Sequence, residues 1–162
     1  MKPKILYIVI PCYNEQEVLS ETAKRIRNKM TALIDAEQIS MDSKVMFVND
    51  GSRDSTWEII TKLHNEDKLF YGINLSRNRG HQNALLAGLM VAKEYADMIV
   101  SMDADLQDDI NAIDEMVEKH YAGNDIVYGV RNKRETDTFF KRATAEMFYK
   151  FMKLLGVETV YN

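Results

Sequence analysis

Apolar and polar positions along the chain fall into blocks whose period changes from strand-like to helix-like and back. Short apolar runs rich in β-branched and aromatic residues predict five strands, at residues 4–10, 44–48, 69–75, 97–102 and 125–130. Apolar residues three and four positions apart predict helices at residues 17–36, 80–95, 110–121 and 138–155. They predict a further helix that is capped by Asp54 or Ser55 and carries apolar residues as far as Leu63. Strands that are apolar on both faces and alternate with helices are typical of a covered parallel sheet. We therefore expect a doubly wound, mostly parallel, Rossmann-like α/β fold with helices on both faces.

Polar residues gather where each predicted strand ends. The five strands run into "PCYNE", "NDGSRDS", "SRNRGHQN", "DADLQDD" and "RNKR", in that order. Ligands of open parallel sheets bind beyond the carboxyl ends of the strands, so we expect these loops to meet at one rim. The plain alternative is that loops are polar because they are solvated and cap helices. That alternative does not require one edge to carry both clustered acids and clustered arginines.

The acidic loop after the fourth strand has a spacing that suits a hard cation. In an extended chain, side chains two positions apart point the same way, so Asp103, Asp105 and Gln107 can face one spot with oxygen atoms. Carboxylates packed together repel unless a cation neutralises them, and Mg²⁺ or Mn²⁺ takes oxygen ligands while keeping places for substrate phosphates. The alternative is a solvated acidic loop in which Asp108 or Asp109 caps the next helix.

The other loops offer groups suited to a nucleotide. Asp50, at the end of the second strand, is interpreted as a ligand of a base or ribose, whereas Asp54 is interpreted as a helix cap. Tyr13 can stack on a base and Glu15 can accept a hydrogen bond from it. A simple turn capped by Asn14 explains that segment equally well.

Basic residues follow the third and fifth predicted strands. Arg131 and Arg134 suit phosphate groups because guanidinium forms bidentate hydrogen bonds, with a solvated charged loop as the alternative. His81 has no second His or Cys close to it in the sequence, which disfavours a metal role.

Composition narrows the range of functions. The chain has 162 residues, of which 46% are hydrophobic and 28% charged, as expected for one globular domain. The net charge of −4 argues against a dedicated nucleic-acid binder. Cys12 is the only cysteine and is interpreted as a packing residue, so a disulfide framework is excluded. No apolar run is long enough for a membrane span, and neither a G-x-G-x-x-G nor a P-loop motif is present.

Five ordered blocks resemble the family 2 glycosyltransferases, which have the nucleotide-sugar-binding GT-A fold. They are "IPCYNEQE", "VNDGSRDST", "LSRNRGHQNALLAGL", "DADLQDD" and "YGVRNKRETDTFFKR", and together they cover nearly the whole chain. The third and fourth blocks look most like the polyprenyl-phosphate branch, which includes dolichyl-phosphate mannosyltransferase and bactoprenol glucosyltransferases. Asp109 stands where this branch usually has Pro, which loosens the loop but removes no ligand.

The resemblance implies roles for particular residues. Asp103 and Asp105, as the ends of a D-x-D element, and Gln107 would hold Mg²⁺ or Mn²⁺. Arg131 would contact phosphate, and Arg134 is a candidate for the acceptor's phosphate. Catalytic roles are thereby implied for Asp103, Asp105, Arg131 and Arg134, and nucleotide-binding roles for Pro11, Tyr13, Glu15, Val48, Asp50, Ala104 and Gln107.

The implied reaction is metal-dependent, inverting transfer of a hexose from a UDP- or GDP-sugar to a polyprenyl phosphate, in cell-envelope glycan synthesis. The alternatives are a sugar-1-phosphate nucleotidyltransferase and a non-catalytic nucleotide-binding α/β module. Residues 1–162 are expected to be a GT-A domain lacking an acceptor or membrane part, soluble alone, with the full-length enzyme at the cytoplasmic face of the membrane. A nucleic-acid partner is not expected, and a homo-oligomer is left open.

Overall fold

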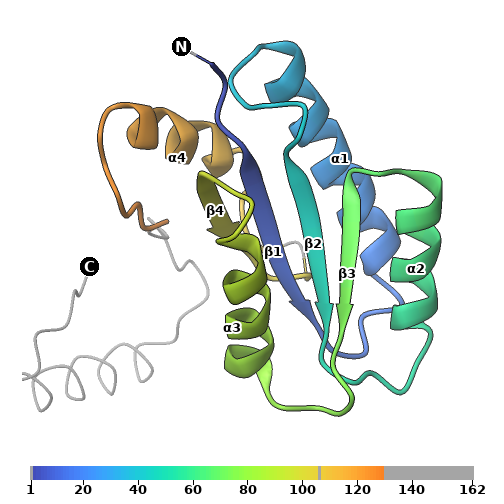
Figure 1. Cartoon of the computed structure of the whole chain (residues 1–162). Coiled ribbons are helices and arrows are strands. Elements are labelled where there is room, and N and C mark those ends of the chain that lie inside the picture. Colours follow the sequence, from blue (N-terminus) through green and yellow to red (C-terminus); the bar gives the residue numbers. More distant parts are fainter. Residues whose placement is uncertain (1, 106, 130–162) are drawn as a thin grey trace, which may run out of the picture. The chain divides into compact units, whose positions relative to one another are not determined.

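The computed structural model describes residues 2–105 and 107–129, and residues 2–127 form one compact unit. Its four strands are all parallel and lie in the order β3-β2-β1-β4 (Figure 1). The elements are β1 (Leu6–Cys12), α1 (Leu19–Asp35), β2 (Lys44–Asn49), α2 (Thr56–Glu66), β3 (Phe70–Asn74), α3 (His81–Ala92), β4 (Met98–Ser101) and α4 (Ala112–Tyr121). The predicted parallel α/β sheet is confirmed.

Helices cover both faces of the sheet, as predicted. Alternate residues of β1 point to opposite sides. Leu6 and Ile8 join the core that α1, α2 and α4 complete, whereas Tyr7 and Val9 join the core beneath α3. The larger core takes its helical members from Leu19, Ala23, Ile26, Met30, Leu33, Ile60, Ile113 and Val117.

Two glycines bring helices close to the sheet. A Cβ atom at Gly88 of α3 would lie 2.4 Å from Val9 Cγ1 and 2.8 Å from Val48 Cγ2, so only glycine fits at this contact. A Cβ atom at Gly72 of β3 would lie 2.6 Å from Ile60 Cγ2 of α2. The close packing of α3 fixes where its first turn, beginning at His81, stands above the carboxyl ends of the strands.

β1 continues through Pro11, where the sequence pattern had predicted its end. Val9 accepts a hydrogen bond from Met102 N–H on the β4 side, and Cys12 accepts one from Asp50 N–H on the β2 side. Residues two apart in a strand direct their backbone groups to the same side, so the missing N–H of Pro11 faces the β4 side, beyond the last paired residue of β4. Pro11 therefore costs the sheet no hydrogen bond.

The predicted fifth strand, 125–130, is wrong over the residues described. Residues 125–129 have no regular secondary structure, and Ile126 is 71% exposed. A β-branched run forms a strand only when a neighbouring strand pairs with it, and none does so within the described part of the chain. Residue 130 and the predicted helix at 138–155 lie outside the described residues. None of the described helices is both long enough and apolar enough to span a membrane.

Candidate functional site

The candidate site lies at the carboxyl ends of β1 and β4, where the order of strands in the sheet reverses. Ligands of open α/β sheets bind beyond such a point. The loop after β1 holds Tyr13 and Glu15, and the loop after β4 holds Asp103 and Asp105. The loops after β2 and β3 flank them on the same edge (Figure 1).

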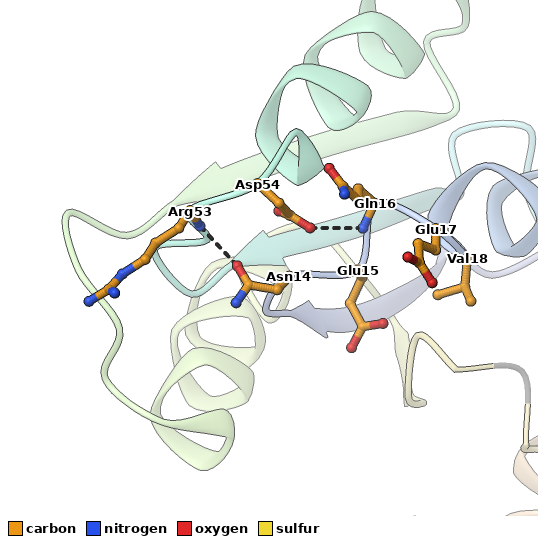
Figure 2. A pocket seen from close by; sticks show the side chains of 7 residues that line it. All are labelled: Asn14, Glu15, Gln16, Glu17, Val18, Arg53 and Asp54. Carbon is orange, nitrogen blue, oxygen red and sulfur yellow. Dashed lines mark hydrogen bonds between the residues drawn. The ribbon is translucent and has the colours of Figure 1, made fainter.

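The loops after β1 and β2 are joined by hydrogen bonds from backbone N–H groups. Asn14 N–H donates to Ser52 Oγ at 2.9 Å, and Arg53 N–H donates back to Asn14 Oδ1 at 2.9 Å. Figure 2 shows this second bond and the bond from Gln16 N–H to Asp54 Oδ2, which is 3.2 Å long. Two further bonds run from Glu15 N–H to Thr56 Oγ1 and from Ser55 N–H to Gln16 Oε1. The two loops therefore form one rigid wall.

Asp54 is a structural acceptor in this wall, although the N-cap residue of α2 is Ser55, the other predicted candidate, whose side chain makes no cap hydrogen bond. Its Oδ1 accepts hydrogen bonds from the N–H of Thr56 at 3.0 Å and from the Thr56 hydroxyl at 2.6 Å. Burial by itself would raise the pKa of Asp54, but the hydrogen bonds from Thr56 and Gln16 outweigh burial and lower it. Asp54 is therefore held in its charged form.

A surface pocket of about 420 Å³ opens against this wall. Figure 2 shows the Glu15 carboxylate pointing away from the hydrogen-bonded side chains of the two loops. The pocket is lined by Asn14, Glu15, Gln16, Glu17, Val18, Arg53 and Asp54. Every lining residue except Val18 has a polar or charged side chain, which suits a hydrophilic ligand.

Glu15 connects the first loop electrostatically to the acidic loop after β4. Partial burial raises the pKa of Glu15, and the negative charges of Asp105, Asp54 and Asp103 raise it further. The carboxylates of two loops more than 80 residues apart in sequence thus lie close enough to repel. A cation placed among them would relieve this repulsion.

The acidic loop alternates buried and exposed residues, but the extended conformation predicted for it is not kept, because Ala104 and Asp105 lie in a turn. Met102 and Ala104 are 8% and 3% exposed, whereas Asp103 and Asp105 are exposed. Asp105 Oδ1 accepts a hydrogen bond from Gln107 N–H at 3.0 Å, and Asp103 N–H donates to Asp108 Oδ2 at 3.3 Å. Asp103 and Asp105 are therefore both exposed, and each takes part in a hydrogen bond within the loop itself.

The donor set fits a metal ion that is shared with a phosphate ligand. Among the described residues, no group of three or more His, Cys, Asp and Glu side chains is arranged to enclose a metal. Mg²⁺ commonly uses one or two carboxylates together with waters and substrate phosphates, and Asp103 and Asp105 meet that requirement. The contribution predicted for the Gln107 side chain stays a prediction.

His81 is a neighbour of this site that sequence reasoning set aside. Its Nε2 lies 3.6 Å from Asp103 Oδ1, and both side chains are about half exposed. The search for a second His or Cys in the sequence could not find this contact, because the partner is a carboxylate in another loop. One signal in the sequence could have pointed to His81: it lies at the start of a predicted helix that follows a strand, at the same edge of the sheet as the acidic loop.

Asp50 is buried and serves the backbone of the next loop. Its Oδ1 accepts from Arg79 N–H at 2.6 Å, and its Oδ2 accepts from Gly80 N–H at 2.9 Å. The neighbouring Gly51 has φ +64°, and a Cβ atom there would lie 2.5 Å from Arg77 C. The sequence predicted Asp50 as a nucleotide ligand, whereas in the structure its carboxylate secures the start of α3.

The remaining predicted residues differ in accessibility. Pro11, Val48 and Ala104 are buried, whereas Tyr13 is 41% exposed and available for stacking. Arg131 and Arg134 lie outside the described residues. Cys12 is confirmed as a packing residue of the main core, where burial, and to a lesser degree the charge of Glu15, raises the pKa of its thiol.

Comparison with known proteins identifies relatives of the chain. The sequence model described as "Glycosyl transferase family 2" matches residues 7–159. A Bacillus subtilis (strain 168) protein named "Uncharacterized glycosyltransferase YkoT" is 49% identical over 158 residues, which make up 98% of this chain and 47% of that protein. The "Prophage bactoprenol glucosyl transferase homolog" of Escherichia coli (strain K12) is 40% identical over 143 residues, or 88% of this chain and 44% of that protein. The chain thus spans less than half the length of these relatives.

The fold also resembles that of a solved structure. The crystal structure of S. aureus TarS 1-349 in complex with UDP matches with a TM-score of 0.52 at 18% sequence identity, over 85% of this chain and 39% of that one. This likeness concerns the fold, and together with the parallel sheet it confirms the predicted GT-A fold. Because the family match covers nearly the whole chain and agrees with the named relatives, the chain belongs to glycosyl transferase family 2.

Proposed function

We propose that the protein to which this chain belongs transfers a hexose, with inversion and with the help of Mg²⁺ or Mn²⁺, from a UDP- or GDP-sugar to a polyprenyl phosphate. The acceptor class rests on relatives named bactoprenol glucosyl transferase, at 38–40% identity, and on the sequence resemblance. Such a reaction serves the synthesis of cell-envelope glycans at a membrane surface.

One observation carries the proposal: the loop after β1 and the loop after β4 lie near enough for the charges of Asp105 and Asp103 to act on Glu15. Burial is the first cause of the raised pKa of Glu15, and the charges of Asp105, Asp54 and Asp103 raise it further. The sequence resemblance assigns the first loop to the nucleotide and the second to the metal. A cation bound between the loops would weaken this repulsion, and a nucleotide diphosphate would supply further oxygen ligands to it.

Each part of the site has a task in this proposal. Tyr13 and Glu15 would bind the base, while Asp103 and Asp105, with Gln107, would hold the cation. A cation bound there would supply positive charge to the diphosphate as it leaves. Pro11, Val48 and Ala104 would form the floor of the nucleotide site, and Asp50 would shape its wall through the backbone of Arg79 and Gly80.

The acceptor chemistry needs no general base. The second pKa of a phosphate monoester is about 6, so the polyprenyl phosphate is largely a dianion at neutral pH and can attack the anomeric carbon directly. What the protein must supply is orientation, because the attacking oxygen has to stand opposite the leaving diphosphate. Arg131 and Arg134 are proposed for this positioning, since guanidinium groups bind phosphate bidentately.

Family membership favours glycosyl transfer over the nucleotidyltransferase alternative, which would share an α/β sheet with this chain but not its match to glycosyl transferase family 2 over residues 7–159. The transfer assay below separates an active enzyme from a non-catalytic nucleotide-binding module.

Calorimetric titration of the chain with UDP and with GDP, each with and without MnCl₂, tests the proposal at its first step. Binding that requires Mn²⁺ and prefers one base is expected. Assay of transfer from a panel of radiolabelled UDP- and GDP-hexoses to undecaprenyl phosphate then tests the acceptor. Manganese-independent binding of both nucleotides, or none, would contradict the proposed metal role.

A further inference from the structure

A buried threonine on α1 reaches the acidic loop between its two aspartates. Thr22 is fully buried, and its Oγ1 donates to the backbone carbonyl of Ala104 at 2.7 Å, across 82 residues of sequence. Ala104 is itself 3% exposed and stands between Asp103 and Asp105. The contact therefore lies directly beneath the pair of carboxylates proposed to hold the cation.

The hydroxyl proton of Thr22 has a second acceptor within reach, but that acceptor is already satisfied. Thr22 Oγ1 lies 3.1 Å from the carbonyl oxygen of Val18, and this oxygen also accepts the helical hydrogen bond from Thr22 N–H at 3.0 Å. Among residues 2–105 and 107–129, the carbonyl of Ala104 receives no other hydrogen bond. A hydroxyl has a single proton, and a buried acceptor left without a donor is costly, so the proton belongs on Ala104.

This bond is one of two that fix the start of the loop. Met102 N–H donates to the carbonyl of Val9 at 3.2 Å and so extends the pairing of β4 with β1 by one residue. The buried residues Met102 and Ala104 are thus each hydrogen-bonded to an element of the core. The exposed residue Asp103 follows Met102, and the exposed residue Asp105 follows Ala104. Without the bond to Thr22, the segment that carries Asp105 would be held to the core by the hydrogen bond of Met102 and by the packing of the Ala104 side chain.

We propose that Thr22 is a positioning residue of the site: its hydroxyl fixes the Ala104 carbonyl and thereby sets the relative placement of Asp103 and Asp105 toward a cation–diphosphate ligand. The effect on ligand binding rests on the proposed function, whereas the hydrogen bond between Thr22 and Ala104 does not depend on it. Groups that orient metal ligands from behind typically change metal affinity by about 10–100-fold when they are removed.

The test compares variants of Thr22 with a matched threonine. Thr22→Val keeps the shape and removes the donor, and Thr22→Ser restores the hydroxyl. Thr22→Cys, which has a weak donor, serves in case the added methyl of valine does not fit against the carbonyl. Thr61→Val is the control, because Thr61 is an exposed threonine of α2 whose Oγ1 donates to a carbonyl of its own helix, that of Trp57 at 2.9 Å. Two readouts are measured: amide hydrogen exchange of residues 102–109, and the affinity for MnCl₂ with UDP and with GDP.

Thr22→Val is expected to speed exchange in residues 102–109 and to weaken manganese-dependent nucleotide binding about tenfold. Thr22→Ser should approach the wild type in both readouts, and Thr61→Val should match it. Wild-type exchange and affinity in Thr22→Val would overturn the positioning role. If the wild-type chain binds neither nucleotide, the proposed function fails, and the exchange measurement still decides whether Thr22 holds the loop.

Discussion

Asp50 and Gly80 are joined by a 2.9 Å hydrogen bond from the backbone N–H to the carboxylate, across 30 residues of sequence. A second bond, from Arg79 N–H, occupies the other carboxylate oxygen at 2.6 Å. One buried side chain at the end of β2 thereby fixes the loop that begins α3. The position of His81, the first residue of α3 and a neighbour of Asp103, depends on this arrangement.

Asp50→Asn should therefore lower the free energy of unfolding by about 1–3 kcal/mol. The amide nitrogen of Asn cannot accept from a backbone N–H, so the buried side chain keeps one of its two hydrogen bonds and turns a donor toward a backbone donor. Urea unfolding followed by circular dichroism measures the loss. Asp97→Asn is the control, because Asp97 also accepts from a backbone N–H, that of Ile5 at 2.8 Å, but is exposed. An equal loss in both variants would contradict the buried role of Asp50.

Gly51→Ala should destabilise the chain more than Gly123→Ala does. Both glycines have positive φ, +64° and +100°, so alanine is strained at either position by about 1–2 kcal/mol. Only at Gly51 would the new Cβ atom also meet backbone, 2.5 Å from Arg77 C and Asn78 N, whereas nothing lies within 4 Å at Gly123. Thermal melts of the two variants check the order, and a smaller loss in Gly51→Ala would refute the close approach.

Glu15→Gln should make the ligand-free chain more stable than the wild type at pH 7. The pKa of Glu15 is raised in the folded chain by burial and by the charges of Asp105, Asp54 and Asp103. The folded state therefore binds the proton more tightly than the unfolded state, and stability falls as the pH rises from about 4.5 through the folded pKa. The advantage of Glu15→Gln should shrink as the pH is lowered toward 4.

Urea unfolding at pH 4 and pH 7 checks this expectation. Glu17→Gln is the control, since it removes an exposed carboxylate from the same loop. The reasoning fails if Glu15→Gln is less stable than the wild type at pH 7, or if Glu17→Gln shows the same pH-dependent gain.

Asp105→Asn should abolish manganese-dependent nucleotide binding without unfolding the chain. Asp105 is exposed, so the fold should tolerate the change, whereas loss of a proposed ligand should weaken binding by at least about 100-fold. Calorimetry with MnCl₂ and UDP or GDP measures the affinity, and Asp35→Asn at the end of α1 is the matched control. Retained manganese-dependent affinity in Asp105→Asn would exclude this residue as a ligand.

The sequence pattern was sufficient to predict the helices and strands whose apolar residues recur at a fixed period. Four predicted strands and four predicted helices are present, because burial on one or both faces leaves a periodic trace in the sequence. The pattern failed at Pro11 and at residues 125–129, where the outcome depends on a neighbouring strand. Whether a strand tolerates proline, or forms at all, is decided by what stands beside it.

The candidate site was predictable in place but not in detail. The rule that ligands bind at the carboxyl ends of parallel strands was enough to bring Glu15, Asp103 and Asp105 to one rim. The structural duties of Asp50 and Thr22 were not predictable, because both act on backbone groups in other loops. Every residue has a backbone carbonyl and nearly every residue a backbone N–H, so residue types do not indicate which of these groups a distant side chain will bind.

The cross-connected loops after β1 and β2 have a consequence for the thermodynamics of ligand binding. Their five mutual hydrogen bonds are made within the chain itself, so these segments lose their conformational entropy during folding, before any ligand arrives. A nucleotide would then meet a preorganised surface and would have little disorder to remove on that side. Differences in affinity among nucleotides would accordingly reflect their direct contacts with the protein rather than the conformational entropy lost in ordering these loops.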